Sequence, residues 1–294
     1  MAKKKLARFA EMEVLPNVFQ PKHEEVFRTD YPLKGKWNEE VFHNDHPIIL
    51  EIGCGKGEYT VELGKLYPEK NFIGLDIKGA RMWKGAKTAV EDGMNNVAFL
   101  RMYAEMLESV FAPGEIAELW ITFPDPQMAK ARKRLSGTRF LSLYRKILAP
   151  QAVIHLKTDS LFLYRYTSAL IELNHLPVEV RTEDLYGCGW EDKILSIKTF
   201  YEKQWLSRGK QIKYLRFSLG EDMNGTLMLY LDQYGNHFYA RTVRELREKV
   251  GSSGSRIAKM YVENGADGEP RHVGYVIAGH WLKMFAPIEL PVNL

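Results

Sequence analysis

The sequence contains little cysteine, no long apolar run and no large excess of charge of either sign. Only Cys54 and Cys188 occur in 294 residues, which excludes a disulfide framework, and neither has the spacing of a zinc site. No segment approaches the roughly 20 apolar residues of a membrane span, and the basic N-terminus lacks a signal-peptide core. We therefore expect a soluble cytoplasmic protein with no membrane segment and no metal.

The basic residues are unevenly distributed, although the net charge is only +4. Two clusters, KKKLAR at residues 3–8 and KARKR at 130–134, supply much of the basic character. The last part of the chain is close to neutral. These differences suggest a basic N-terminal segment (1–40), a main domain (41–219) and a small accessory module (220–294).

Apolar runs alternate regularly with helical patterns through the main domain. The predicted strands are residues 47–52, 71–77, 96–102, 118–123 and 152–158, and a closing strand is expected at 212–219. The predicted helices include 80–93, 139–148 and 160–175. This alternation predicts an α/β fold, a Rossmann-like, doubly wound and mainly parallel sheet. Residues 220–294 suggest a small α+β module with strands at 226–233, 237–242, 256–264 and 271–285 and a helix at 243–250.

The stretch EIGCGKG, from Glu51 to Gly57, follows the first strand of the main domain. Glycine lets the backbone approach a ligand, and ligands of open α/β sheets bind at the carboxyl ends of strands. Asp76 ends the next strand, where a carboxylate can accept the hydroxyls of a ribose. The GxGxG spacing differs from the GxGxxG of pyrophosphate sites, which favours S-adenosylmethionine over NAD. The alternative interpretation is a tight glycine turn beside a solvated aspartate, with no role in ligand binding.

A second cluster, ITFPDPQMAKARKRLSGTRFL, follows the fourth strand at residues 121–141. Pro124 and Pro126 flank Asp125 and stiffen the turn that carries its carboxylate. The cations that follow could neutralise phosphates of a nucleic acid, and they are Lys130, Arg132, Lys133, Arg134 and Arg139. A rigid loop with a solvated basic face is the alternative.

These motifs resemble the bacterial tRNA (guanine-N7)-methyltransferases. The resemblance rests on LEIGCGKGEYTVELGKLYPEKNFIGLDIKGAR, FPDPQMAKARKRLSGTRFL, HLKTDS and IKTFYEKQWLSRGKQIKYLRFSL. It implies the S-adenosylmethionine-dependent methyltransferase fold and methyl transfer to N7 of a guanine in the variable loop of tRNA. The chain departs from the family pattern at Gln127, Met128 and Ala129, where its loop is shorter.

The residues and the resemblance together predict individual roles. The cofactor contacts are Glu51, Gly53, Gly55, Asp76 and Tyr103, and the catalytic acid is Asp125. The substrate contacts are Lys130, Asp159, Thr199 and Glu202, and the further RNA contacts are Arg132, Lys133 and Arg134. Asp159 directly precedes a predicted helix, so a helix cap is an equally open interpretation for this residue.

The chemistry of guanine is consistent with these roles. N7 carries an unprotonated lone pair, so its attack on a sulfonium methyl requires alignment and no general base. A carboxylate placed in advance would stabilise the positive charge that develops on the purine. Two other functions remain open, a nucleotide-dependent oxidoreductase and a catalytically silent RNA-binding protein on the same fold. We expect tRNA as the partner, and the sequence leaves the oligomeric state open.

Overall fold

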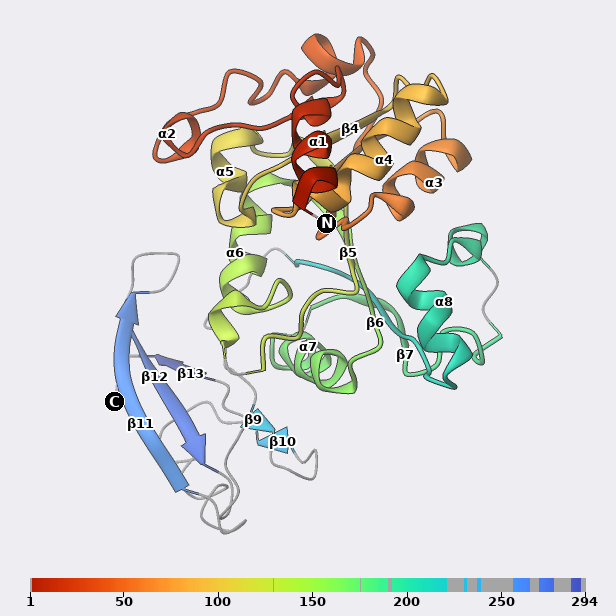
Figure 1. Ribbon diagram of the computed structural model, residues 1–294. Helices are drawn as coiled ribbons and strands as arrows, with labels where there is room; N and C mark the ends of the chain where they lie inside the picture. The colour runs from red at the N-terminus through yellow and green to blue at the C-terminus, as the bar shows by residue number, and fades with distance from the viewer. Residues whose placement is uncertain are drawn as a thin grey trace.

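The main feature of the computed structural model is an eight-stranded sheet (Figure 1). The structure describes residues 2–128, 130–174, 176–189, 192–220, 230–231, 237–238, 256–264, 270–277 and 287–291. In spatial order the strands are β1 (Val18–Phe19), β4 (Val97–Leu100), β3 (Asn71–Leu75), β2 (Ile48–Ile52), β5 (Ile116–Thr122), β6 (Leu148–Thr158), β8 (Lys213–Ser218) and β7 (Val178–Thr182). Neighbours are parallel except around β8, which runs antiparallel to β6 and β7. The predicted mainly parallel sheet is confirmed.

Helices cover both faces of this sheet. They are α1 (Ala2–Met12), α2 (His23–Val26), α3 (Glu58–Leu66), α4 (Gly79–Glu91), α5 (Leu107–Val110), α6 (Thr138–Ile147), α7 (Leu161–Leu173) and α8 (Phe200–Ser207). Short helical turns occur at Asn38–Phe42, Ala104–Met106, Ala131–Lys133 and Lys193–Ser196. In Figure 1, α3 and α4 lie to one side of β5, and α5 and α6 lie to the other.

The central strands are buried on both faces. Successive side chains of a strand point to opposite faces, and those of β2 enter two different apolar clusters. Leu50 and Ile52 belong to one cluster, whereas Ile49 packs in the other with Phe99 and Trp120. A doubly wound parallel sheet is covered by helices on both faces. This packing fixes the positions of the strand ends and of the loops that follow them.

The strand order reverses between β2 and β5. From β2 the chain continues to β3 and β4 on one side, and then crosses to β5 and β6 on the other. A crevice forms at such a reversal, outside the carboxyl ends of the strands. The loops that follow β2 to β5 therefore converge on one place.

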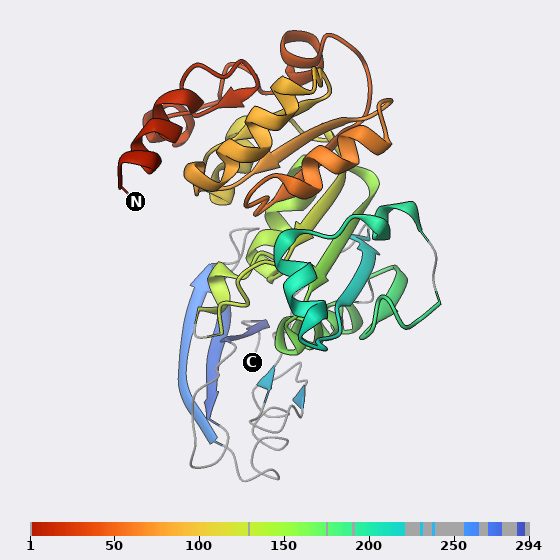
Figure 2. The same cartoon turned by 45° about the vertical axis from the view of Figure 1, so that its right-hand side comes forward.

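The N-terminal segment belongs to the same body as the sheet. β1 pairs in parallel with β4 at the sheet edge, and α1 packs against α4. Met12 and Trp37 are fully buried. In Figure 2 the N-terminal helix (red) lies at the edge of the molecule, next to the N label. The boundary near residue 41 stays a prediction.

Beyond residue 220 the described residues form five strands. β9 (Tyr230–Leu231) pairs antiparallel with β10 (His237–Phe238). β12 (Pro270–Ile277) pairs antiparallel with both β11 (Arg256–Asn264) and β13 (Pro287–Pro291). The predicted helix at 243–250 lies outside the described residues. The division of the chain near residue 220 stays a prediction.

Candidate active site

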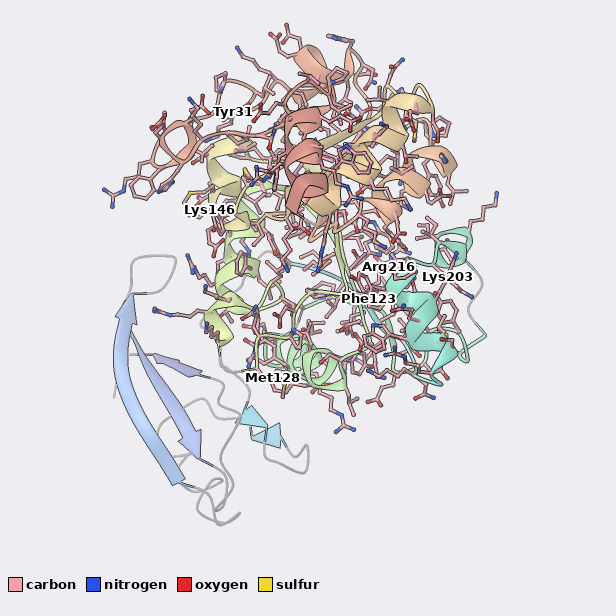
Figure 3. All side chains as sticks on the ribbon, viewed as in Figure 1. Tyr31, Phe123, Met128, Lys146, Lys203 and Arg216 are labelled. Carbon is pink, nitrogen blue, oxygen red and sulfur yellow. The ribbon has the colours of Figure 1, made fainter. Side chains whose placement is uncertain are left out.

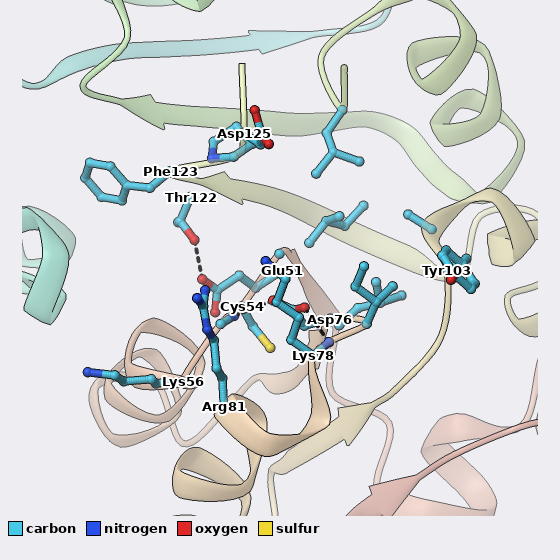
Figure 4. A pocket seen from close by; sticks show the side chains of 18 of the residues that line it. Glu51, Cys54, Lys56, Asp76, Lys78, Arg81, Tyr103, Thr122, Phe123 and Asp125 are labelled. Carbon is cyan, nitrogen blue, oxygen red and sulfur yellow. Dashed lines mark hydrogen bonds between the residues drawn. The ribbon is translucent and has the colours of Figure 1, made fainter. Parts of the chain in front are cut away.

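A pocket of about 510 Å³ opens at the carboxyl ends of β2, β3, β4 and β5 (Figure 4). Its volume lies within the range of about 300–1,000 Å³ that is typical of small-molecule sites. Eight of the residues predicted from the sequence line it: Glu51, Gly53, Gly55, Asp76, Tyr103, Asp125, Lys133 and Thr199. The structure therefore brings the glycine motif and the Pro-Asp-Pro turn into one cavity.

The glycine turn needs glycine for two different reasons. Gly53, Gly55 and Gly57 have φ of 79°, 58° and 70°, a region that other residues rarely adopt. A Cβ added at Gly53 or Gly55 would meet no atom closer than 3.9 Å, so their backbone stays open beside the pocket. A Cβ at Gly57 would lie 2.5 Å from Phe99. The first two glycines thus leave room for a ligand, and the third allows α3 to pack on the sheet.

Asp76 organises this turn through both carboxylate oxygens. One oxygen accepts a hydrogen bond from the Gly55 amide at 2.9 Å, and the other accepts one from the Lys78 amide at 2.8 Å. A carboxylate offers about four lone-pair sites, so about two remain for hydroxyl donors in the pocket. A ribose, with two neighbouring hydroxyls, fits this requirement.

Glu51 lies on the floor of the pocket, between Asp76 and Asp125 (Figure 4). Its carboxylate accepts hydrogen bonds from the Thr60 amide and from the hydroxyls of Thr60 and Thr122. Burial raises the pKa of this carboxyl group, and the threonine hydrogen bonds oppose the shift. Glu51 therefore joins β2 to α3 and β5 beneath the ligand space.

The turn that carries Asp125 has an unusual backbone. Phe123 and Gln127, on either side of Pro-Asp-Pro, both have φ of 47°, which is rare for residues with a side chain. One Asp125 oxygen accepts a hydrogen bond from the Gln127 amide at 3.0 Å. The side chain of Asp125 is exposed and lines the pocket. The turn thus presents a carboxylate to any ligand that enters.

The predicted basic cluster divides into exposed and buried residues. Lys130, Arg132 and Lys133 are exposed, and Lys133 lines the pocket. Arg134 is 0% exposed, and its guanidinium donates to the carbonyl oxygens of Pro126 and Met128 at 3.2 and 3.0 Å. The guanidinium of Arg134 therefore points into the protein, and the phosphate contact expected at this residue stays a prediction.

Glu202 is also buried, and its predicted contact with the guanosine stays a prediction. Its carboxylate lies 2.8 Å from the ammonium of Lys157, and both side chains are 0% exposed. Glu202 also caps α8, since it accepts from the Thr199 amide at 3.3 Å while the Thr199 hydroxyl accepts from the Glu202 amide at 3.2 Å. Thr199 lines the pocket, whereas Glu202 does not. Lys157 lies within an apolar strand pattern, and no role was predicted for it.

Two further predicted substrate residues lie outside the pocket lining. Asp159 forms an ion pair with Lys210 at 3.3 Å, and Lys130 is exposed on the loop after the Asp125 turn. The cap of α7 is Ser160, whose hydroxyl accepts from the Leu163 amide at 3.2 Å, so the helix-cap interpretation does not apply to Asp159. Contact of Asp159 or Lys130 with the substrate stays a prediction.

Sequence reasoning missed several residues of the pocket. Tyr201 lines it from α8, Thr122 from the end of β5, and Lys56 and Arg81 from the glycine-turn side. Tyr201 lies two residues after the predicted Thr199 in the TFYE segment, so its position was the one signal available. Within the described residues there is no cluster of metal-ligating side chains, and no helix there is long and apolar enough to span a membrane.

Known proteins match this chain across the pocket and the sheet. A family described as "Putative methyltransferase" matches residues 45–215. The tRNA (guanine-N(7)-)-methyltransferase of Porphyromonas gingivalis is 62% identical over 213 residues, which are 71% of this chain and 87% of the relative. The enzyme of the same name from Bacteroides fragilis is 52% identical over 240 residues, which are 81% of this chain and 95% of the relative.

A solved structure, that of the 16S rRNA methyltransferase KamB, covers 62% of this chain and 92% of its own, with 15% identity and a TM-score of 0.49. The curated relatives are far more similar in sequence, and this chain covers most of their length. The matched region includes the glycine turn and the Asp125 turn, which meet in one pocket. The chain therefore belongs to the family of tRNA (guanine-N7)-methyltransferases.

Proposed function

We infer that this protein transfers the methyl group of S-adenosylmethionine to N7 of a guanine in tRNA. The observation that supports this inference best is the single pocket that joins the glycine turn and Asp76 to the turn of Asp125. Relatives that are 50% to 62% identical carry the name of this activity. We further propose that the guanine lies in the variable loop, as the family resemblance implies.

The glycine-turn side of the pocket fits the methyl donor. The open backbone at Gly53 and Gly55 admits the ligand, and Asp76 keeps lone pairs for the ribose hydroxyls. Tyr103 is 64% exposed at the pocket wall, so we propose that its ring stacks on adenine. The N-terminus of α3 offers partial positive charge to the methionine carboxylate. When bound, S-adenosylmethionine supplies an electrophilic methyl group on a sulfonium.

The Asp125 side performs the recognition of guanine. N7 needs no base, so the main task of this side is to align the purine with the methyl group. We propose that Asp125 stabilises the positive charge that the purine acquires, and does so more in the transition state than in the ground state. A carboxylate also accepts from the N1–H and N2 amino group of guanine, which adenine does not offer in this arrangement.

We propose that tRNA phosphates bind along the exposed part of the basic cluster. Lys130 and Arg132 would contact the backbone of the RNA, and such contacts are steeply dependent on salt. Lys133 lies at the pocket itself, so we propose it as the lysine nearest the target nucleoside. Thr199 lines the pocket from the start of α8, and we propose that it contacts the same nucleoside. The cytoplasm, where tRNA is present, is the proposed location.

Transfer of labelled methyl from S-adenosylmethionine to tRNA that lacks N7 methylation tests this function. We expect label in 7-methylguanosine after digestion to nucleosides, and at one variable-loop position when fragments are mapped. The same tRNA already methylated at N7 is the control and should accept no label. Binding of tRNA without transfer would favour the silent RNA-binding protein, and label in another nucleoside would refute the proposed reaction.

A further inference from the structure

We propose that Arg134 is a positioning residue that holds the Asp125 turn in its strained conformation. The proposal rests on the proposed function, because it concerns how the turn presents Asp125 to the substrate. Arg134 itself does not line the pocket, and its side chain is fully buried. It would therefore act on the reaction only through the turn.

The contacts of Arg134 bracket the strained part of the turn. Its Nε donates to the carbonyl of Pro126 at 3.2 Å, and its Nη2 donates to the carbonyl of Met128 at 3.0 Å. Between these two carbonyls lies Gln127, whose φ is 47°. A guanidinium is planar and rigid, so two bonds from one group fix the relative orientation of two peptide planes.

The opposite side of the guanidinium rests on a helix. Its central carbon lies 4.6 Å from the ring centre of Phe162 and 4.4 Å from that of Tyr166, both on α7. Nearby, the hydroxyls of Ser136 and Thr167 are hydrogen bonded at 2.7 Å, so the end of the same loop is also fastened to α7. Met128 and Phe123, which lie on either side of Asp125 in the chain, are labelled in Figure 3. Arg134 thus connects a helix of the core to the catalytic turn.

A strained turn needs such a connection. Residues with a side chain leave the left-handed region unless the surrounding structure holds them there, and strained residues of this kind cluster at functional sites. Phe123 and Gln127 are both in this region, one on each side of Asp125. The Asp125–Gln127 hydrogen bond lies within the turn, whereas Arg134 supplies bonds from outside it. Loss of Arg134 should therefore let the turn relax and move the Asp125 carboxylate.

Arg134→Lys and Arg134→Met separate this role from a phosphate contact. Lysine keeps the charge but cannot form both planar bonds, so we expect both variants to lose about 10- to 100-fold in kcat, because a displacement of about 1 Å can cost about 100-fold. Affinity for S-adenosylmethionine should change less than about 3-fold, and the salt dependence of the tRNA KM should stay that of the wild type. A phosphate contact would instead give Arg134→Lys a normal kcat and Arg134→Met a reduced salt slope.

Ser136→Ala is the matched control. It removes the Ser136–Thr167 hydrogen bond between the loop and α7, which does not involve the Asp125 turn, so it should lower the thermal midpoint and leave kcat unchanged. If kcat fell equally in Ser136→Ala, general loosening of the loop would explain the loss and the proposal would fail. If Arg134→Met does not fold, the kcat of Arg134→Lys is compared with that of Ser136→Ala.

The decisive readout is a double-mutant cycle with Asp125→Ala. If Arg134 acts only through Asp125, then adding Arg134→Lys to Asp125→Ala should lower kcat by less than about 2-fold, because residues that act as a unit are non-additive. Equal losses in both backgrounds would overturn the proposal, as would a wild-type kcat in Arg134→Lys. A wild type without methyl transfer would refute the proposed function instead, so the two failures can be told apart.

Discussion

The two sides of the pocket are held in place by different kinds of interaction. On the glycine-turn side, Asp76 is fixed by backbone amides of the pocket loops, at Gly55 and Lys78. On the Asp125 side, two buried cations, Arg134 and Lys157, form the contacts. Arg134 lies over α7 and binds the turn, and Lys157 of β6 pairs with the carboxylate that caps α8.

This difference matters for how each side performs its task. A backbone-held site depends on a short motif and can bind one small cofactor in a fixed way. The Asp125 side is held by buried Arg134 and Lys157, so it depends on how α7, α8 and β6 pack together. The cations on this side are therefore of two kinds: exposed residues that we propose bind RNA, and buried residues that stabilise the fold.

The largest effect is expected at the buried pair. Lys157→Met leaves the Glu202 carboxylate buried without its partner, so the free energy of unfolding should fall by about 3–5 kcal/mol. Burial itself lowers the pKa of Lys157, and Glu202 opposes this shift. Urea denaturation of the variant at neutral pH measures the loss.

The double variant Lys157→Met with Glu202→Gln is the control for this prediction. Glutamine can still cap α8 through Thr199, but it removes the buried charge, so most of the lost stability should return. A single variant as stable as the wild type would show that the pair is not part of the framework. So would a double variant that is no more stable than the single one.

Most of the fold was predictable from the sequence. The central strands are short apolar runs followed by helical patterns, and these local signals located β2 to β6 along the chain. Asp76 and the glycines were found because their roles are local, in the turn itself. β1 was missed because Val18–Phe19 is only two residues long, and its pairing with β4 is a tertiary contact.

The charged residues of the Asp125 side were harder to predict. KARKR is typical of a solvated basic face, and the sequence does not show that Arg134 turns inward onto Phe162 and Tyr166. Glu202 had the correct spacing for a capping box with Thr199, but its ion pair joins it to Lys157 on β6, far away in the sequence. Local spacing cannot reveal partners that only the fold brings together.

A smaller effect is expected on the glycine-turn side. Asp76→Ala removes a charged acceptor from the pocket, so binding of S-adenosylmethionine should weaken by about 1.5–3 kcal/mol. Calorimetric titration measures this loss, and tRNA affinity at low salt should stay unchanged. Asp76→Asn keeps one acceptor and should lose less. Equal cofactor affinity in wild type and Asp76→Ala would contradict the assigned ribose contact.

The smallest effect concerns the exposed cations. Replacement of both Lys130 and Arg132 by alanine should reduce the log–log salt slope of tRNA binding by roughly 0.7–0.9 per lost contact. Lys146→Ala is the matched control, because Lys146 pairs with Glu108 at 2.7 Å between α6 and α5, and its slope should equal that of the wild type. If the double variant kept the wild-type slope, tRNA would bind elsewhere on the protein.

The central claim is that the Asp125 turn performs the chemistry, whereas the glycine turn holds the cofactor. The most direct test is the single-turnover rate of methyl transfer by Asp125→Ala, with S-adenosylmethionine and tRNA both saturating so that binding defects do not contribute. We expect a rate lower than that of the wild type by about 100-fold or more, because the developing charge on guanine loses its stabilising carboxylate. A rate near that of the wild type would show that Asp125 does not stabilise the transition state.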